Sequence, residues 1–219
     1  IELRPVEAEL GKLFANAYRY INFAISNQFY SIAERFGADF HRIHAAVTQD
    51  YPRMAGFARA GLAAGPCLLK DTMQLAAFNH NGFVLGQAAM MVNEGLPTVI
   101  IERVRQRFPL SDMTAAILGM AFKGNSDDPR DSLAFKLRKL LALECRRVLC
   151  TDVYIRDASF VPLEVALREA DIFFVGACHD EYRALEIDRP VVDVFGFLER
   201  VRHEDSGDGS GGLHRRLCR

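Results

Sequence analysis

The sequence predicts an α/β protein in which an all-helical first part is followed by a parallel, doubly wound sheet. Through residue 108 the apolar residues recur at helical spacing, and beyond it short apolar runs alternate with helical segments. Continuous apolar runs are typical of strands that are buried on both faces of a sheet. We therefore expect a helical domain over residues 1–108, a sheet domain over 109–200 and a flexible tail over 201–219.

The longest expected element is one helix over residues 5–36, called here the spine helix. Pro5 suits the first helical turn, and Gly37 ends the apolar pattern. At 1.5 Å per residue such a helix is roughly 45 Å long, which exceeds the span of one small core. The spine helix also carries large apolar residues, Phe14 and Phe29 among them. We therefore expect a homodimer built around residues 5–36 of both chains.

Three shorter helices complete the helical part. Asp39 is expected to cap a helix that runs through Val47. A second helix is expected from Lys70, after a glycine-rich loop. A third covers residues 85–108 and contains Pro97, at which we expect a kink or a break.

The second half reads as a Rossmann-like unit of alternating strands and helices. The expected strands are 114–122, 146–154, 171–179 and 190–196, and the expected helices are 131–144, 163–170 and 180–185. Such sheets bind ligands beyond the carboxyl ends of their strands. The sequence lacks a G-x-G-x-x-G motif after any strand, so this unit is not expected to hold NAD in the usual way.

Composition limits the class of protein. Half of the 219 residues are hydrophobic, a quarter are charged and the net charge is −1, as in soluble globular proteins. The scattered basic residues exclude a nucleic-acid or anionic-membrane surface, and no apolar run is long enough to span a bilayer. Five cysteines without zinc spacing exclude a metal site and indicate a reducing cytoplasm. The chain begins at Ile1 rather than Met, so we expect a piece of a longer protein.

Residues 61–71, GLAAGPCLLKD, place one cysteine in a glycine-rich loop just before a helix. Glycine and alanine leave the backbone open to a ligand, and Pro66 stiffens the turn before Cys67. A helix N-terminus favours the thiolate, which is the nucleophilic form of cysteine. The pattern predicts a nucleophile loop; the alternative is that Cys67 packs as a small hydrophobic residue.

The loop after the first strand, AFKGNSDDPRDS at residues 121–132, carries two cations, Lys123 and Arg130. Two cations beside a helix N-terminus suit a phosphate ligand, and the alternative is a solvated charged loop. His179 and Tyr182 follow a later strand, where either contact with a nucleotide or a structural role is expected.

Three motifs together resemble the UDP-glucose/GDP-mannose dehydrogenase family. They are EAELGKLFANA (7–17), similar to A-E-L-x-K-x-x-x-N; GLAAGPCLLKD (61–71), similar to G-G-x-C-x-x-K-D; and LGMAFKGNSDDPRDS (118–132), similar to G-x-A-F-K-x-x-x-D-D-x-R-x-S. The motifs stand in the family's order, and the resemblance runs from about Glu2 to Leu198.

The resemblance implies a dehydrogenase that oxidises a nucleotide sugar at C6 to the uronic acid, as in polysaccharide biosynthesis, and reduces two NAD molecules. It implies that an NAD-binding domain precedes this chain and is absent from it. By the resemblance, Cys67 is the covalent nucleophile, and Lys12 and Asn16 donate hydrogen bonds to the oxyanions. Asp71 is then expected to orient Lys12 or the hydrolytic water. The alternative is that Lys12 is a solvated helix lysine and Asn16 a helix-surface amide, which would be preferred without the cysteine loop.

Further site residues follow from the same resemblance. Lys123, Arg130, Phe122 and Gly65 are expected to contact the nucleotide sugar, with Phe122 against the sugar or the base. Either Arg53 or Arg59 is the arginine that family dimers lend to the neighbouring active site, with Arg53 preferred. Lys70 is expected to bind a phosphate of the substrate or of the cofactor, or else to face solvent.

Two departures from the family pattern leave the substrate open. Ala64 and Pro66 replace residues of the usual cysteine loop, and the run 191–197 offers no arginine to the nucleotide. UDP-glucose, a UDP-N-acetylhexosamine, GDP-mannose and TDP-glucose all remain possible substrates. An alternative function is a dimerising module that binds the nucleotide sugar without catalysis. An unrelated thiol enzyme would need a histidine base near Cys67, which no local motif supplies.

Overall fold

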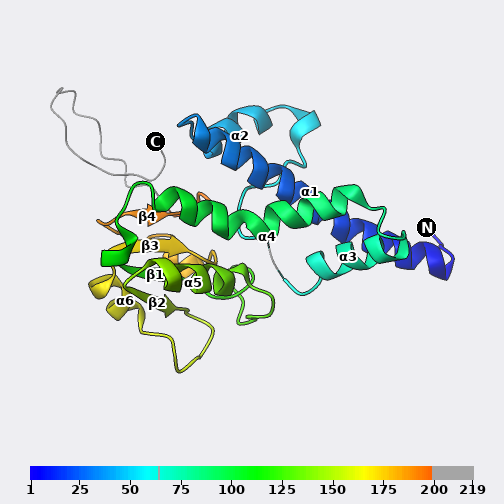
Figure 1. Cartoon of the computed structure of the whole chain (residues 1–219). Helices are drawn as coiled ribbons and strands as arrows, with labels where there is room; N and C mark the ends of the chain where they lie inside the picture. Colours follow the sequence, from blue (N-terminus) through cyan, green and yellow to red (C-terminus); the bar gives the residue numbers. More distant parts are fainter. Residues whose placement is uncertain (64, 199–219) are drawn as a thin grey trace.

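The computed structural model describes residues 1–63 and 65–198. Its helical part and its sheet lie side by side, and the long helix α4 runs along the sheet half, with α1 on its other side (Figure 1). The expected tail, residues 201–219, lies outside the described residues, as does Ala64.

The expected spine helix is helix α1, Pro5–Arg35. Arg4 stands before its first turn, where its backbone N–H and its side chain both donate to the Glu7 carboxylate, at 2.8 and 2.7 Å. At the other end the backbone of Gly37 adopts a left-handed φ of 66° and its N–H donates to Glu34. The start and the end of the helix therefore agree with the sequence prediction.

The remaining helices of this half also follow the sequence closely. They are α2 (Phe40–Thr48), the short 3₁₀ helix η1 (Pro52–Met54), α3 (Leu68–Phe78) and α4 (Val84–Val104). The Asp39 carboxylate caps α2 by accepting from the N–H groups of His41 and Arg42. Helix α4 ends at Val104 rather than Phe108, and it passes through the buried Pro97 without a break.

Helix α4 is long and apolar enough to cross a bilayer by length and composition. The expectation that no apolar run could span a bilayer is therefore wrong for this helix by length and composition, although Gln87, Asn93 and Glu94 interrupt its apolar residues. The helix packs against α1, α3 and α5, so a single such helix is weak support for a membrane span.

The second half is a four-stranded parallel sheet of order β2-β1-β3-β4. Its elements are η2 (Leu110–Asp112), β1 (Thr114–Leu118), α5 (Leu133–Glu144), β2 (Arg147–Thr151), α6 (Leu163–Glu169), β3 (Ile172–Val175), η3 (Asp180–Tyr182) and β4 (Val191–Val192). All four strands are shorter than expected. The apolar residues at the ends of the predicted strands lie beyond the sheet. After β1, for example, a left-handed φ of 86° at Gly119 turns the chain out of the strand.

Helices cover both faces of the sheet, as a doubly wound arrangement requires. Ala115 and Ile117 of β1 face α5 and the helical half, whereas Ala116 and Leu118 face α6. The first of these cores continues into the helical half through residues such as Leu62 and Ile100. The two halves of the chain therefore share one continuous apolar core.

Candidate active site around Cys67

Helices α1 and α3 bring together three of the expected catalytic side chains. Lys12 and Asn16 lie one turn apart on α1, and both donate to the same oxygen of Asp71 on α3. Asn16 Nδ2 lies 2.6 Å from Asp71 Oδ2, and Lys12 Nζ lies 3.3 Å from it. Asn16 and Asp71 are buried, while the Lys12 side chain remains largely exposed. The pairing of Lys12 and Asn16 was expected from their spacing.

The Asp71 carboxyl is held in its charged form. Burial raises its pKa, but the hydrogen bonds from Asn16 and Lys12 and the charges of Lys12 and Lys70 lower the pKa below its ordinary value. Lys70 Nζ lies 3.7 Å from the other carboxylate oxygen, Oδ1, and is exposed. Lys70 therefore lies on the solvent side of Asp71. Its expected contact with a phosphate remains a prediction.

Cys67 is exposed and stands at the N-cap of α3, as expected from the sequence. Its carbonyl accepts the first helical hydrogen bond, from the N–H of Asp71 at 2.9 Å. The helix begins at Leu68, two residues before the expected start at Lys70. One turn of α3 therefore separates the thiol from the carboxylate that Lys12 and Asn16 hold.

Gly65 in the cysteine loop is in close contact with Phe122 from the sheet half. The backbone of Gly65 has a φ of 115°, and a Cβ placed on it would lie 2.7 Å from Phe122 Cδ2. The open backbone that we predicted to admit a ligand is thus covered by a side chain of the protein. Phe122 joins the cysteine loop to the loop that carries Lys123 and Arg130.

The two cations of that loop are both exposed. Lys123 Nζ lies 5.5 Å from the centre of the Phe122 ring. The Arg130 guanidinium binds both oxygens of Asp128, at 2.6 to 3.1 Å, and these bonds hold the pKa of Asp128 at about 2. Asp128 also raises the pKa of Arg130, and Cys67 lies near enough to add to that shift. The Arg130 guanidinium is therefore already paired with a carboxylate of its own loop.

A buried hydrogen bond between His179 and the Asp152 carboxylate supports the loop that carries Lys123 and Arg130. Asp152 Oδ2 lies 3.1 Å from His179 Nε2 and accepts from the N–H of Met120 at 2.6 Å. His179 Nδ1 accepts the N–H of Asn125, so the ring presents its Nε2–H to the carboxylate. Burial raises the pKa of Asp152, but the hydrogen bonds from His179 and from backbone N–H groups lower it to about 2. His179 is fully buried, which favours a structural role over contact with a nucleotide.

Asp152 was not among the site residues predicted from the sequence. The available signal was its position directly after the apolar residues of β2, at the carboxyl edge of a parallel sheet.

Arg53 lies on η1, which packs beside α2, and it is exposed. It therefore stands outside the group formed by Lys12, Asn16 and Asp71, and its proposed role across a dimer remains a prediction.

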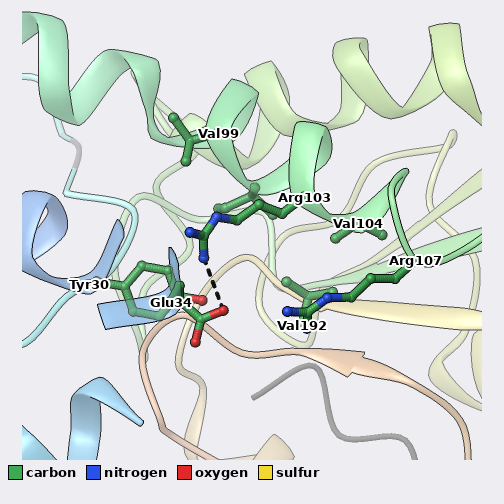
Figure 2. Close-up of a pocket in the computed structure, with 8 residues that line it drawn as sticks. Tyr30, Glu34, Val99, Arg103, Val104, Arg107 and Val192 are labelled. Atoms are coloured by element: carbon green, nitrogen blue, oxygen red, sulfur yellow. Dashed lines mark hydrogen bonds and ion pairs between the residues drawn. The ribbon is translucent and has the colours of Figure 1, made fainter. Parts of the chain in front are cut away.

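A separate pocket lies between α1, α4 and β4 (Figure 2). Glu34 and Arg103 form an ion pair across it at 3.1 Å, and burial raises the pKa of Glu34 against the opposing charge of Arg103. The cavity volume is about 20 Å³, which accommodates about one water molecule. It is too small for a nucleotide sugar.

Comparison with known proteins identifies the family. Residues 6–94 match the central domain of the UDP-glucose/GDP-mannose dehydrogenase family, and residues 116–200 match its UDP binding domain. The chain belongs to the UDP-glucose/GDP-mannose dehydrogenase family. The first match contains Lys12, Asn16, Cys67 and Asp71, and the second contains the cationic loop. The resemblance drawn from the three motifs is confirmed.

Several relatives in this family are dehydrogenases of nucleotide sugars. The UDP-N-acetyl-D-mannosamine dehydrogenase of Methanocaldococcus jannaschii is 29% identical over 96% of this chain and 48% of its own length. The UDP-glucose 6-dehydrogenase of Haloferax volcanii is 32% identical over 82% of this chain and 45% of its own length. The solved structure of a UDP-glucose dehydrogenase from Pyrobaculum islandicum matches with a TM-score of 0.79 and 26% identity, over 89% of this chain and 49% of that one.

The chain thus spans about half the length of the dehydrogenases it matches in this family. Within residues 1–63 and 65–198, no group of three or more His, Cys, Asp or Glu side chains could hold a metal ion.

The contact between Gly65 and Phe122 generates a stability prediction for this family member. Gly65→Ala places a methyl group against the ring and forces an L-residue into the φ of 115°. We expect a loss of about 1–3 kcal/mol in the free energy of unfolding, measured by urea denaturation.

Gly11→Ala is the matched control, because a Cβ at this position of α1 meets nothing within 4 Å. In the interior of an exposed helix the same change should stabilise the protein, by about 0.5–1 kcal/mol. Equal unfolding free energies for the two variants would contradict the contact at Gly65.

Proposed function

We propose that the chain is the catalytic and sugar-nucleotide-binding part of an NAD-dependent nucleotide-sugar 6-dehydrogenase. The observation that carries this proposal is the position of Cys67, one helical turn before an Asp71 carboxylate that Lys12 and Asn16 hold. A thiol, a cation, an amide and a carboxylate are the groups required for oxidation through a covalent thioester. The names of the relatives support the same reaction class.

The reaction removes four electrons from the C6 alcohol in two steps. Loss of the hydroxyl proton and of one hydride from C6 gives an aldehyde. The Cys67 thiolate adds to the aldehyde carbon and forms a thiohemiacetal, whose C6 hydrogen leaves as the second hydride. Water then adds to the resulting thioester, the carbon–sulfur bond breaks, and the uronic acid and the free thiolate are released.

Lys12 and Asn16 are proposed to stabilise the negative oxygen that develops at C6 in each tetrahedral state. Both present N–H donors from the rigid helix α1, so they need no rearrangement during the reaction. Asp71, kept charged by these neighbours, holds the Lys12 ammonium in place and accepts a proton from the hydrolytic water.

The turn after β1 differs from that of the usual nicotinamide dinucleotide site. In the usual site the turn after β1 offers backbone N–H groups to a pyrophosphate. Here the N–H groups of Met120 and Ala121 donate to Asp152 instead. We therefore propose that NAD, which accepts the hydrides in this reaction class, is bound mainly by a further domain that precedes this chain. Lys70 is the residue of this chain proposed to contact it.

Lys123 and Arg130 are proposed to bind the diphosphate of the nucleotide sugar, with Phe122 and Gly65 beside the sugar. Both cations are exposed, and Phe122 of the same loop contacts Gly65 in the cysteine loop. The UDP binding domain match and the names of the relatives favour a UDP-hexose over a guanosine or thymidine nucleotide. We propose residues 1–108 and 109–200 as the two domains. We also propose a cytoplasmic location, because the four cysteines that the structure describes are all free, which suits a reducing compartment.

The alternative function is a module that binds a nucleotide sugar and dimerises without catalysis. The exposed apolar residues of α1 support the dimer in either case. Phe14, Tyr18, Ile25, Phe29, Ile32 and Phe36 are 43–84% exposed. Their spacing puts them on one face of the helix, opposite the face that carries Asn16. We propose that a second copy of the chain covers this face, with Arg53 reaching the active site of the partner subunit.

Replacement of Cys67 tests the chemistry in a chain that also carries the NAD-binding domain. Cys67→Ala should bind the nucleotide sugar normally and lose nearly all formation of uronic acid, because no thioester forms. Cys67→Ser should accumulate a covalent sugar ester, which intact-protein mass spectrometry detects as added mass. Cys145→Ala is the control and should turn over like wild type. Wild-type turnover in Cys67→Ala would rule out the nucleophile.

Neutralisation of a loop cation tests nucleotide binding on this chain itself. Calorimetric titration with UDP-glucose should show binding that Lys123→Ala weakens by about 1.5–3 kcal/mol, because a charge-assisted contact is lost. Lys139→Ala on α5, also an exposed lysine, should leave the affinity unchanged. Equal affinity in all three proteins would remove the phosphate role of Lys123.

Light scattering tests the dimer. The wild-type chain at micromolar concentration should show twice its mass of 24.5 kDa. Ile25→Glu, in the middle of the exposed face of α1, should shift the protein to monomer because the charge loses its solvation in the interface. Leu143→Glu on α5 replaces an equally apolar, 84% exposed residue and should leave the dimer intact. A monomeric wild type would contradict the proposal.

A further inference from the structure

A second amide on α1 contacts the cysteine loop, at a position that the proposed mechanism does not use. Asn27 lies eleven residues after Asn16, which is close to three helical turns, so both amides lie on the same face of α1. Asn27 is fully buried, as is Asn93 on α4. Buried amides on a helix are costly unless they are hydrogen-bonded, so their partners identify what they hold.

The partners of Asn27 are the start of the cysteine loop and Asn93. Asn27 Oδ1 accepts the N–H of Gly61 at 2.8 Å, and Asn27 Nδ2 donates to Asn93 Oδ1 at 2.9 Å. Asn93 Nδ2 in turn donates to the carbonyl of Tyr20 on α1, at 2.9 Å. The hydrogen bond to Tyr20 fixes the orientation of the Asn93 amide, and the bond to Asn93 fixes that of the Asn27 amide. Asn27 Oδ1 is therefore held in position to accept the N–H of Gly61.

The loop from Gly61 to Asp71 is thus attached to one face of α1 at both of its ends. Asn27 holds Gly61, and Asn16 holds Asp71. The two amides are about 16 Å apart along the helix at 1.5 Å per residue. Cys67 lies between the two attachment points, so the distance between the amides limits where its thiol can be.

Phe195 from the sheet half covers Gly61 on another side. A Cβ at Gly61 would overlap the Phe195 ring, so only glycine fits between this ring and the neighbouring chain. Gly61 is therefore held by Asn27 and also packed against the segment that follows β4.

We propose that Asn27 is a positioning residue for Cys67, with Asn93 as the group that orients it. This role rests on the proposed function. A thiolate adds to an aldehyde only from about 3–3.5 Å and from one face of the carbonyl plane, with the sulfur lone pair aligned to the C=O π* orbital. Asn27 sets that approach from the start of the loop, whereas the first hydride transfer does not involve the thiol. Loss of Asn27 should therefore slow the second oxidation and spare the first.

Asn22 provides the matched control on the same helix. Its side chain also binds backbone groups of the segment before the loop, the carbonyl of Gly56 and the N–H of Ala58, the latter at 3.3 Å. Asn22 is only partly buried, and both partners precede Gly61. Asn22→Ala removes the same kind of bond without releasing the cysteine loop.

The first arm measures hydrogen exchange on this chain. Asn27→Ala should speed amide exchange in residues 61–67 by about tenfold or more, because Gly61 loses its acceptor. Exchange in the sheet should stay unchanged. Asn22→Ala should leave residues 61–67 at the wild-type rate, and equal protection of this loop in Asn27→Ala would overturn the proposal.

The second arm measures single-turnover hydride transfer, by the absorbance of reduced nicotinamide, in a chain with the NAD-binding domain. Asn27→Ala should keep the first phase and slow the second by about 100-fold, the cost of a misplacement of about 1 Å. Asn27→Asp, whose carboxyl is expected to stay protonated in this fully buried position, keeps an oxygen for the N–H of Gly61 and an O–H for Asn93 Oδ1, and should restore the second phase. Failure of this rescue, or equal loss of both phases in Asn27→Ala, would leave Asn27 with a merely structural role and overturn the proposal.

If the wild-type protein shows no hydride transfer at all, the proposed function itself is wrong. If the wild type shows both phases, the effect of Asn27→Ala on each phase tests the positioning role alone. Should Asn27→Ala fail to fold, Asn93→Ala replaces it, because it removes the acceptor that orients the Asn27 amide. The same selective loss of the second phase is expected, and two unchanged phases would overturn the proposal.

Discussion

The architecture depends on one requirement, which is that the amides buried on α1 must be hydrogen-bonded. Burying an amide without partners costs several times what one hydrogen bond contributes. Asn16 meets this requirement at Asp71, and Asn27 meets it at Gly61 and Asn93. The position of the cysteine loop therefore follows from the hydrogen bonds that the buried amides of α1 make to Gly61 and Asp71. The opposite face of the same helix carries exposed apolar side chains, so a single 31-residue helix has one buried face, in which the amides lie among alanines and tyrosines, and one exposed apolar face.

The sheet half controls the same loop through aromatic side chains. Phe122 lies against Gly65, and the Phe195 ring lies against Gly61. Both contacts use glycines, where the absence of a Cβ lets a ring reach the backbone. Together with the shared apolar core, these contacts mean that the cysteine loop is shaped by both halves of the chain.

The sequence predicted those features that depend on local pattern. The limits of α1 followed from Pro5, Gly37 and a helical apolar period, and the order of strands and helices followed from the alternation of periods. The strands were predicted too long, because apolar residues such as Met120 and Ala121 are buried in a turn that Asp152 organises. Pro97 was expected to disturb α4, but tertiary packing keeps the helix continuous. Asp152 and Asn27 act through partners 27 to 66 residues away, and no local pattern reports such pairs.

The hydrogen bonds of Asp152 have a consequence for the entropy of binding. Its pKa of about 2, below the ordinary 3.8, means that folding favours the carboxylate, so the stability it contributes is complete above about pH 4. That stability is lost only as the pH falls through about 2. At neutral pH the turn that carries Phe122 and Lys123 is therefore ordered before any ligand arrives. An anion that binds there immobilises few additional groups, so most of its interaction free energy remains available as affinity.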